Sequence, residues 1–461
     1  MYIINKNSKT PLHIQLYEEI KKEIISQLKV GDKLQSIRKI ATQYNLSKNS
    51  VESAYSQLVI EGYVESYSKR GYFVIDTNLE ILSTYKRVEK LTNIQEKEFL
   101  YDFHPARLEK SSFPLKIWKR TFTKAINESI DFGRYSQIQG EYGLRDEVSK
   151  YLIQSRGINC DANQVVICNG FSDSMGLIIS LLKKRYKTLA IENPGYAVAS
   201  KVFEAHGYKI KKIPVDNNGI HLEKLKESKA KLVYITPSHQ YPTGVTIPIS
   251  NRIKLLNWAK ENDALIIEDD YDSELTYENR PIPALQGLDR FDKALYVGTF
   301  SKSLSPAIRV SYLVLPKFLI NELNDTLESK VCLFTQKTLE LFLKEGHWDR
   351  HLRKIRTQNK KKYLLLKKQL QTELGSSMKI VNKGGGLAIH INPTIPFDFI
   401  LLKKLATDNE IKLHFAKKRC GGDWDALMMG FGGLKEEDII PAVQIFAIIW
   451  KKCILDYKAV I

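Results

Sequence analysis

Five short apolar segments between residues 165 and 299 constrain the fold of this chain more than any other feature. They are VVIC, TLAIE, KLVYIT, ALIIED and ALYVGT, over residues 165–168, 188–192, 231–236, 264–269 and 294–299. Each segment is bounded by Gly, Pro or a charged loop, and helical stretches separate them. Apolar strands that alternate with helices are typical of a largely parallel sheet covered on both faces. The sequence therefore predicts an α/β fold whose ligands gather beyond the carboxyl ends of the strands.

Residues suited to binding or catalysis lie where these strands are expected to end. In chain order they are Gly170, Ser172, Tyr196, Thr236, Pro237, Asp269, Tyr271 and Lys302. The lysine belongs to the segment GTFSKSLSPAIR, residues 298–309, and the Asp and Tyr before it belong to EDDYDSE, residues 268–274. Because the carboxyl ends of neighbouring parallel strands meet at one edge of a sheet, we expect these side chains to form a single site.

Lys302 and its neighbours predict a cofactor. A loop lysine with Thr299 before it and Arg309 after it suits a Schiff base to an aldehyde that carries a phosphate. The upstream Asp269 and Tyr271 suit a pyridinium nitrogen and a phenolate oxygen. Pyridoxal 5′-phosphate (PLP) is the common cofactor that needs all of these groups together. A lone lysine is most often a solvated surface group, so it is the set of neighbours that favours the Schiff base.

The first 75 residues predict a different kind of unit. Apolar residues recur at helical spacing from Pro11 to about Gln27, and a second short helix is expected to start near Ser36. Ser47 is a good N-cap for a third helix. That helix would present three residues at its exposed N-terminus, as recognition helices do in the major groove: Lys48, Asn49 and Ser50.

Two short strands around a basic turn follow the third helix. The turn contains Lys69, Arg70 and Gly71, and such a wing can lie along the DNA backbone. The alternative is a small helical protein-interaction domain with a hairpin. Residues 77–99 are charged and contain no Gly or Pro, which favours a linker. We therefore divide the chain into a DNA-binding domain over 1–76, this linker, and a large domain over 100–461.

Composition limits the remaining classes. The formal net charge of +18 permits DNA binding but does not establish it, because residues 1–75 carry only 11 Lys and Arg against 7 Asp and Glu. The five cysteines form no CxxC pair, which favours a reducing compartment. The N-terminus lacks a signal pattern and no apolar run approaches about 18 residues. We expect a cytoplasmic protein that does not enter a membrane.

The segment from Gly31 to Val74 closely resembles the GntR-type winged helix-turn-helix. The resemblance implies that five residues fall where that family contacts DNA: Ser36, Arg38, Lys48, Ser50 and Gly71. One departure is Gln35, where members of the family often carry a proline.

The large domain resembles the fold type I aminotransferases, which are PLP-dependent. NGFSDS, residues 169–174, occupies the place of their phosphate cradle at a helix start. The resemblance implies that Gly170, Phe171 and Ser172 serve there and that Tyr196, in ENPGY, stacks on the pyridine ring. It also implies that Asp269 pairs with the ring nitrogen, with Asp270 the weaker candidate.

Together the two halves resemble the MocR/GabR regulators over nearly the whole chain, the linker excepted. PSHQYPTGVTIP, over 237–248, and PIPALQGLD, over 281–289, support that resemblance. It implies a homodimer, arranged head-to-tail, in which each DNA head lies over the large domain of the partner. The two heads would read paired half-sites in double-stranded DNA.

The large domain departs from the aminotransferase pattern where the substrate is held. Aminotransferases usually carry an Arg two residues before the Gly of a late GF motif, and here that position is Met428. Arg419 lies nearby in sequence and is a candidate substitute. The run AVAS, residues 197–200, also lacks an Arg that some relatives use to hold a carboxylate. Without a clamp, a full transamination cycle loses much of its positioning advantage.

These features favour a PLP-dependent transcription regulator, whose internal aldimine on Lys302 senses an amine effector or reports PLP itself. The missing carboxylate clamp favours PLP or an effector without an α-carboxylate. The alternative is a catalytically active aminotransferase that carries a DNA-binding head. The sequence does not identify the effector, the operator or the sign of regulation.

Two further motifs are expected to be structural. His347 and His351 have the spacing of a helical metal pair, but no third ligand is evident, so no metal is predicted. GGG, residues 384–386, lacks the strand–turn–helix setting of a nucleotide loop. It is expected to form a tight turn before the strand LAIHI.

Overall fold

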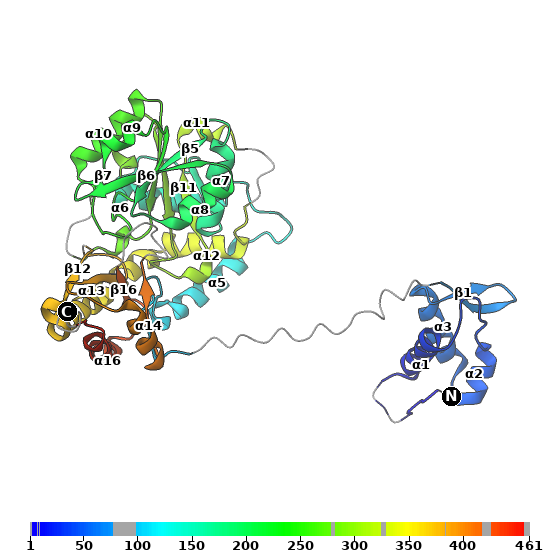
Figure 1. Cartoon of the computed structure of the whole chain (residues 1–461). Coiled ribbons are helices and arrows are strands. Elements are labelled where there is room, and N and C mark those ends of the chain that lie inside the picture. Colours follow the sequence, from blue (N-terminus) through cyan, green and yellow to red (C-terminus); the bar gives the residue numbers. More distant parts are fainter. Residues whose placement is uncertain are drawn as a thin grey trace. The chain divides into compact units, whose positions relative to one another are not determined.

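The computed structural model describes residues 2–6, 8, 10–76, 98–277, 282–323, 329–382, 384–416 and 426–455. These residues form two compact units, Met1–Lys97 and Glu98–Ile461 (Figure 1). The predicted linker over 77–99 lies outside the described residues except for its last two. None of the helices in the described ranges is both long enough and apolar enough to cross a membrane.

The first unit contains three helices and a hairpin, as the sequence predicts. The elements are α1 (Leu12–Ser26), α2 (Ile37–Tyr44), α3 (Lys48–Ile60), β1 (Val64–Tyr67) and β2 (Gly71–Val74). The predicted cap at Ser47 is confirmed, because its hydroxyl accepts a hydrogen bond from the amide of Ser50. The second helix starts at the expected place, and the hydroxyl of Ser36 caps it by accepting a hydrogen bond from the amide of Lys39.

A single apolar core holds this unit together. Four side chains on one face of α3 are buried in it: Val51, Ala54, Tyr55 and Leu58. They pack against Leu16, Ile20 and Ile24 of α1, which recur at helical spacing on one face. The antiparallel hairpin β1–β2 closes the core through Val64 and Val74, which are paired across the two strands.

An eight-stranded sheet organises the second unit. Its strands are β4 (Val165–Cys168), β5 (Thr188–Asn193), β6 (Lys209–Asp216), β7 (Gly219–Ile220), β8 (Leu232–Ile235), β9 (Leu265–Asp270), β10 (Ala294–Thr299) and β11 (Ser311–Val314). The order across the sheet is β4-β11-β10-β9-β8-β5-β6-β7. The run from β10 to β6 is parallel, whereas β11 is antiparallel to β10 and β4, and β7 is antiparallel to β6. All five predicted strands are confirmed.

Helices cover both faces of this sheet. On one face Val297 and Ile267 pack against α7 (Gly170–Leu182), α8 (Ala197–Ala205) and α11 (Lys317–Ile320). On the other face Tyr296 and Ile266 pack towards a second group of helices. That group comprises α6 (Tyr142–Arg156), α9 (Leu222–Glu227), α10 (Ile249–Glu261) and α12 (Leu333–Lys344). Neighbouring strand residues thus serve opposite faces.

A smaller antiparallel sheet lies C-terminal to the large one in the chain. It contains β12 (Met378–Ile380), β13 (Ala388–Pro393), β16 (Leu427–Gly430) and β15 (His414–Phe415), in that order. A separate parallel pair joins β14 (Ile411–Lys412) to β3 (Tyr101–Asp102). The described part of this unit also contains α5 (Leu115–Ser129), α13 (His347–Leu374), α14 (Phe399–Asp408) and α16 (Ile439–Lys452). GGG precedes β13, which confirms the predicted turn before that strand.

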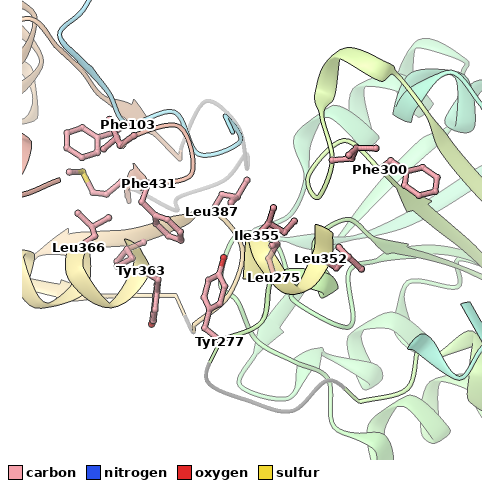
Figure 2. Packing of buried hydrophobic residues seen from close by; sticks show 14 of the residues in the cluster. Phe103, Leu275, Tyr277, Phe300, Leu352, Ile355, Tyr363, Leu366, Leu387 and Phe431 are labelled. Carbon is pink, nitrogen blue, oxygen red and sulfur yellow. The ribbon is translucent and has the colours of Figure 1, made fainter. Parts of the chain in front are cut away.

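One apolar cluster joins the small sheet to the loops of the large sheet. Figure 2 shows Leu275 and Tyr277 between Leu387 and Phe431 on one side and Phe300 on the other. Phe300 is fully buried directly after β10. Burying a side chain of this size contributes roughly 1.5–3 kcal/mol. This packing fixes the start of the loop that carries Lys302.

Candidate cofactor site and DNA-contact surface

The carboxyl ends of the parallel strands surround a cavity of about 270 Å³. Seven of the residues predicted to bind a cofactor line it: Phe171, Tyr196, Asp269, Tyr271, Thr299, Lys302 and Arg309. They come from the starts of α7 and α8, the ends of β9 and β10, and the loop before β11. Residues far apart in sequence thus meet where the strand order predicts a ligand site.

One end of the cavity is built for an anion. Arg309 lies beside the N-terminus of α7, where helix amides and the helix dipole favour negative charge. Gly170 makes this approach possible, because a Cβ atom there would lie 2.2 Å from the Arg309 guanidinium. Ser301 and Thr299 also line this cavity. Ser172 lies in the first turn of α7 but is not among the lining residues.

Aromatic rings form the walls around the middle of the cavity. The rings of Phe171 and Tyr196 meet edge to face at 5.2 Å, and those of Tyr196 and Tyr241 do so at 5.6 Å. Tyr241 in turn meets the ring of Tyr271 at 6.0 Å. Such a set of rings offers flat and edge contacts to a planar ligand ring.

Asp269 supplies the anionic group of the cavity. Burial raises its pKa to about 7, and the hydroxyl of Tyr234 donates a hydrogen bond that opposes this shift. A bound ring cation would favour the ionised carboxylate. Asp270, by contrast, accepts hydrogen bonds from Arg156 and Tyr296, each at 2.7 Å, and is not among the residues that line the cavity. The two adjacent carboxylates therefore face different partners.

A buried carboxylate also positions Thr236. Glu192 accepts hydrogen bonds from the amide of Thr236 at 3.0 Å and from its hydroxyl at 2.7 Å. Burial raises the pKa of Glu192 to about 7. Thr236 lines the cavity between neighbouring strands, as its place at the end of β8 predicts.

The ε-amine of Lys302 lies 6.0 Å from the centroid of the Tyr271 ring. The loop behind it is fixed by His351, whose Nε2 lies 2.7 Å from the carbonyl oxygen of Ser303. His347 starts α13 and contacts Arg350 and Glu345. Both histidines are buried in these contacts, which agrees with the structural roles expected for them.

A second, smaller cavity of about 30 Å³ adjoins the first and shares Lys302 and Tyr271 with it. Its other walls include His239, Asp272, His390 and Met428. Met428 is fully buried, and its sulfur lies 3.9 Å from the hydroxyl of Tyr241. Arg419, the candidate substitute for the missing Arg, lies outside the described residues.

The residues of this region that were not predicted from the sequence include Tyr234, His239, Tyr241 and Ser301. His239 and Tyr241 belong to PSHQYPTGVTIP, a segment that supports the family resemblance without giving either residue a role. Tyr234 lies within an apolar strand and therefore looks like a core residue. Ser301 lies next to Lys302, so its position in the segment was the available signal.

The predicted DNA contacts lie on the first unit. Lys48, Asn49 and Ser50 form the first turn of α3, and the side chain of Lys48 is 62 % exposed. The wing turn carries exposed Lys69 and Arg70. Gly71 follows with a φ of +108°, a conformation that favours glycine. Ser36 and Arg38 are exposed at the start of α2, and the Ser36 hydroxyl also caps that helix.

The fold and the site define the class of the protein: a winged helix-turn-helix head joined to an aminotransferase-like α/β unit. Residues 12–74 match the gntR family of bacterial regulatory proteins, and residues 106–393 match the class I and II aminotransferases. The chain belongs to the MocR/GabR subfamily of GntR-type transcription regulators.

Relatives that cover between 77% and 97% of the chain support this membership. The HTH-type transcriptional regulator YdeL of Bacillus subtilis is 34% identical over 97% of this chain and 98% of its own length. The probable rhizopine catabolism regulatory protein MocR of Rhizobium meliloti is 31% identical over 77% and 76%. The pyridoxine biosynthesis regulator PdxR of Corynebacterium glutamicum is 27% identical over 95% of both chains.

Solved structures show the fold of the second unit. A multiple substrate aminotransferase from Thermococcus profundus is similar with a TM-score of 0.69 and 22% identity, over 78% of this chain and 93% of that one. The kynurenine aminotransferase of Pyrococcus horikoshii gives a TM-score of 0.68 at 21% identity, over 81% and 93%.

Proposed function

We propose that this DNA-binding regulator holds PLP on Lys302 and converts the state of that site into a change in DNA binding. One observation carries the proposal: a single cavity brings together Lys302, Asp269, Tyr271 and Arg309. An amine, a buried carboxylate, a phenol and an anion-binding helix start are the groups that PLP requires. Because its proposed partner is chromosomal DNA, the protein would act in the cytoplasm.

Each residue has a defined task in this proposal. Arg309 and the start of α7 bind the phosphate, and the close approach at Gly170 supports this assignment. Asp269 holds the ring nitrogen in its cationic form, and Tyr196 packs against the ring. Bound PLP supplies an aldehyde that can exchange one amine partner for another. Lys302 is the resident amine that an incoming amine would replace.

The effector is either a small amine or PLP itself. MocR is named for rhizopine catabolism and PdxR for pyridoxine biosynthesis, so relatives differ in the metabolism they serve. Met428 supports an effector without an α-carboxylate, because a buried thioether replaces a bidentate cation at that position. Coupling to DNA then requires that the effector bind two states of the protein with different affinities.

We further propose that the protein is a head-to-tail homodimer. Exposed aromatic residues between α5 and α6 support a protein interface: Phe132 is 68 % exposed and Tyr135 is 90 % exposed. Phe122 and Tyr142, on the flanking helices, are also exposed. Large exposed apolar groups that gather in one segment are typical of interaction surfaces. Two heads in such a dimer would read paired half-sites.

The coupling is tested by measuring DNA affinity with and without PLP. Genomic fragments selected by the purified protein provide the DNA, and fluorescence anisotropy gives the affinity. We expect saturating PLP, alone or with the correct amine, to change the wild-type Kd by at least about fivefold, the lower end of allosteric coupling. The Lys302→Ala variant should change by less than about twofold. The proposal would be contradicted if the Kd of the wild type for DNA were the same with and without PLP and a panel of amines, while absorbance showed that PLP was bound.

An assay of product formation distinguishes a regulator from the alternative, a catalytically active aminotransferase. Sustained turnover with an amino donor and a 2-oxoacid, at about 1 s⁻¹ or faster, would favour a working enzyme. A regulator is expected to stop after at most one half-reaction.

A further inference from the structure

His239 and Asp272 form a buried pair beside the cofactor cavity. The Nδ1 atom of His239 lies 2.9 Å and 3.1 Å from the two carboxylate oxygens of Asp272. The same Nδ1 atom lies 3.2 Å from the hydroxyl oxygen of Tyr271. His239 is 9 % exposed and Asp272 is 4 % exposed. Nδ1 of His239 therefore lies within hydrogen-bonding distance of both Asp272 and Tyr271, and the pair is shielded from bulk water.

Because residues 385 and 386 are glycines, the backbone can lie directly against the side chains of His239 and Asp272. A Cβ atom on Gly386 would lie 2.6 Å from a carboxylate oxygen of Asp272, and one on Gly385 would lie 3.2 Å from Nε2 of His239. Gly386 also has a φ of +69°, which disfavours other residues. The GGG motif thus has a role here beyond the turn before β13.

Counting protons fixes the direction of these hydrogen bonds. An ionised carboxylate only accepts, so Nδ1 of His239 must carry the hydrogen that lies towards Asp272. The Tyr271 oxygen is then an acceptor on the same N–H. Burial, followed by the charge of Asp272, raises the pKa of Tyr271 well above its usual value, so the phenol keeps its own proton. The phenol can therefore donate this proton in a hydrogen bond to a ligand in the cavity that Tyr271 and Lys302 line.

We propose that His239 and Asp272 are positioning residues that direct the phenolic proton of Tyr271 into the cofactor cavity. Without the Nδ1–H group, the phenol could donate to the buried pair instead. With it, the phenol donates towards the oxygen on the ligand ring. This inference rests on the proposed function, because the ring oxygen belongs to PLP.

Other titratable groups surround the pair. Lys302 and His390 line the same small cavity. Tyr241 acts on Tyr271 from the loop after β8, Asp269 from the end of β9 and Glu192 from β5. Burial, followed by the nearby His239, lowers the pKa of His390 to about 4, so His390 is neutral above pH 6. Its Nδ1 lies 2.9 Å from the carbonyl of Pro242. His390 is therefore a matched buried histidine of the same cavity, whose Nδ1 contacts a carbonyl oxygen rather than a carboxylate.

The test is the pH at which the visible absorbance of the PLP-loaded protein changes. A hydrogen bond to an oxyanion withdraws charge from it, so a proton elsewhere on the conjugated cofactor is held less tightly. Losing the bond should raise the midpoint. We expect Tyr271→Phe to raise it by about 1 unit or more, and Asp272→Asn to raise it by about 0.5 unit.

Asp272→Asn separates positioning from simple charge. If the substitution only removed the negative charge of Asp272 and left Tyr271 unaffected, it would lower the midpoint. The reason is that a nearby negative charge stabilises the protonated form of the cofactor. In a Tyr271→Phe background the positioning effect has no target, so Asp272→Asn should then lower the midpoint. His239→Asn should raise it in the wild type, and His390→Asn should shift it by less than about 0.2 unit. A lowered or unchanged midpoint in the Asp272→Asn single variant would overturn the inference.

A second measurement detects the proton on His239 directly in the wild-type protein. Nuclear magnetic resonance of the ¹⁵N-histidine-labelled full chain, with His239→Asn used for assignment, should show Nδ1 of His239 protonated at pH 8. An unprotonated Nδ1 would overturn the inference even if cofactor spectra agreed. Failure of the wild type to bind PLP would refute the proposed function instead, and would leave this proton assignment standing.

Discussion

Replacing Lys302 with Ala is expected to abolish the Schiff-base absorbance band of the PLP-loaded protein and to weaken PLP binding about 100-fold, or roughly 2.7 kcal/mol. Lys302 is the amine that lines the cofactor cavity beside Tyr271. The variant keeps Arg309 and Asp269, so residual non-covalent binding should remain. An absorbance titration followed by dialysis measures both effects.

Lys330→Ala is the matched control for this experiment. Lys330 is an exposed lysine of the same unit, with a side chain that is 68 % exposed and paired with Asp173. Its loss should leave the absorbance and the affinity unchanged. If the two variants behaved alike, Lys302 would be an ordinary surface group and the site assignment would be wrong.

The double variant Arg38→Ala/Lys48→Ala is expected to weaken DNA binding about 100-fold in low salt and to leave PLP uptake intact. Both residues are exposed at the starts of helices of the first unit. A dimer would lose four phosphate contacts, so the slope of log K against log salt should fall by about 3.6. Anisotropy titrations between 50 and 200 mM salt, roughly the range in which such contacts dominate, provide the measurement.

Lys22→Ala/Lys29→Ala removes charge from the same unit outside the helix-turn-helix and the wing. Lys22 lies on α1 and Lys29 lies in the loop that follows it, and both are exposed. A small change in affinity with an unchanged salt slope is expected. An equal loss in the two double variants would show that net charge, rather than the predicted surface, governs DNA binding. Loss of PLP uptake in Arg38→Ala/Lys48→Ala would mean that the two units are wrongly divided.

Local patterns predicted the elements that carry the sites. The start of α2 was expected near Ser36, and the cap at Ser47 located α3, because capping is a short-range interaction. Apolar runs located five strands because each is buried on both faces. They did not locate β6, whose burial is mostly on one side and whose sequence, KIKKIPVD, is rich in lysine. Partly exposed strands lack the continuous apolar signal on which the prediction depended.

Contacts between residues that are far apart in the chain could not be predicted from the sequence. Tyr234 pairs with Ile267 of the adjacent strand, and that register brings its hydroxyl to Asp269. The family resemblance favoured Asp269 over its neighbour Asp270 for the cavity, but only the folded sheet shows that Asp270 pairs with Arg156. The pairing of His239 with Asp272 likewise depends on two loops that meet only in the folded protein.

Borohydride reduction of the PLP-loaded wild-type protein, followed by peptide mass spectrometry, identifies the amine that holds the cofactor. Reduction converts a Schiff base into a stable secondary amine, which marks the lysine that formed it. We expect a single pyridoxyl adduct on the peptide that contains Lys302. An adduct confined to other lysines, or no adduct on a folded protein in excess PLP, would contradict it.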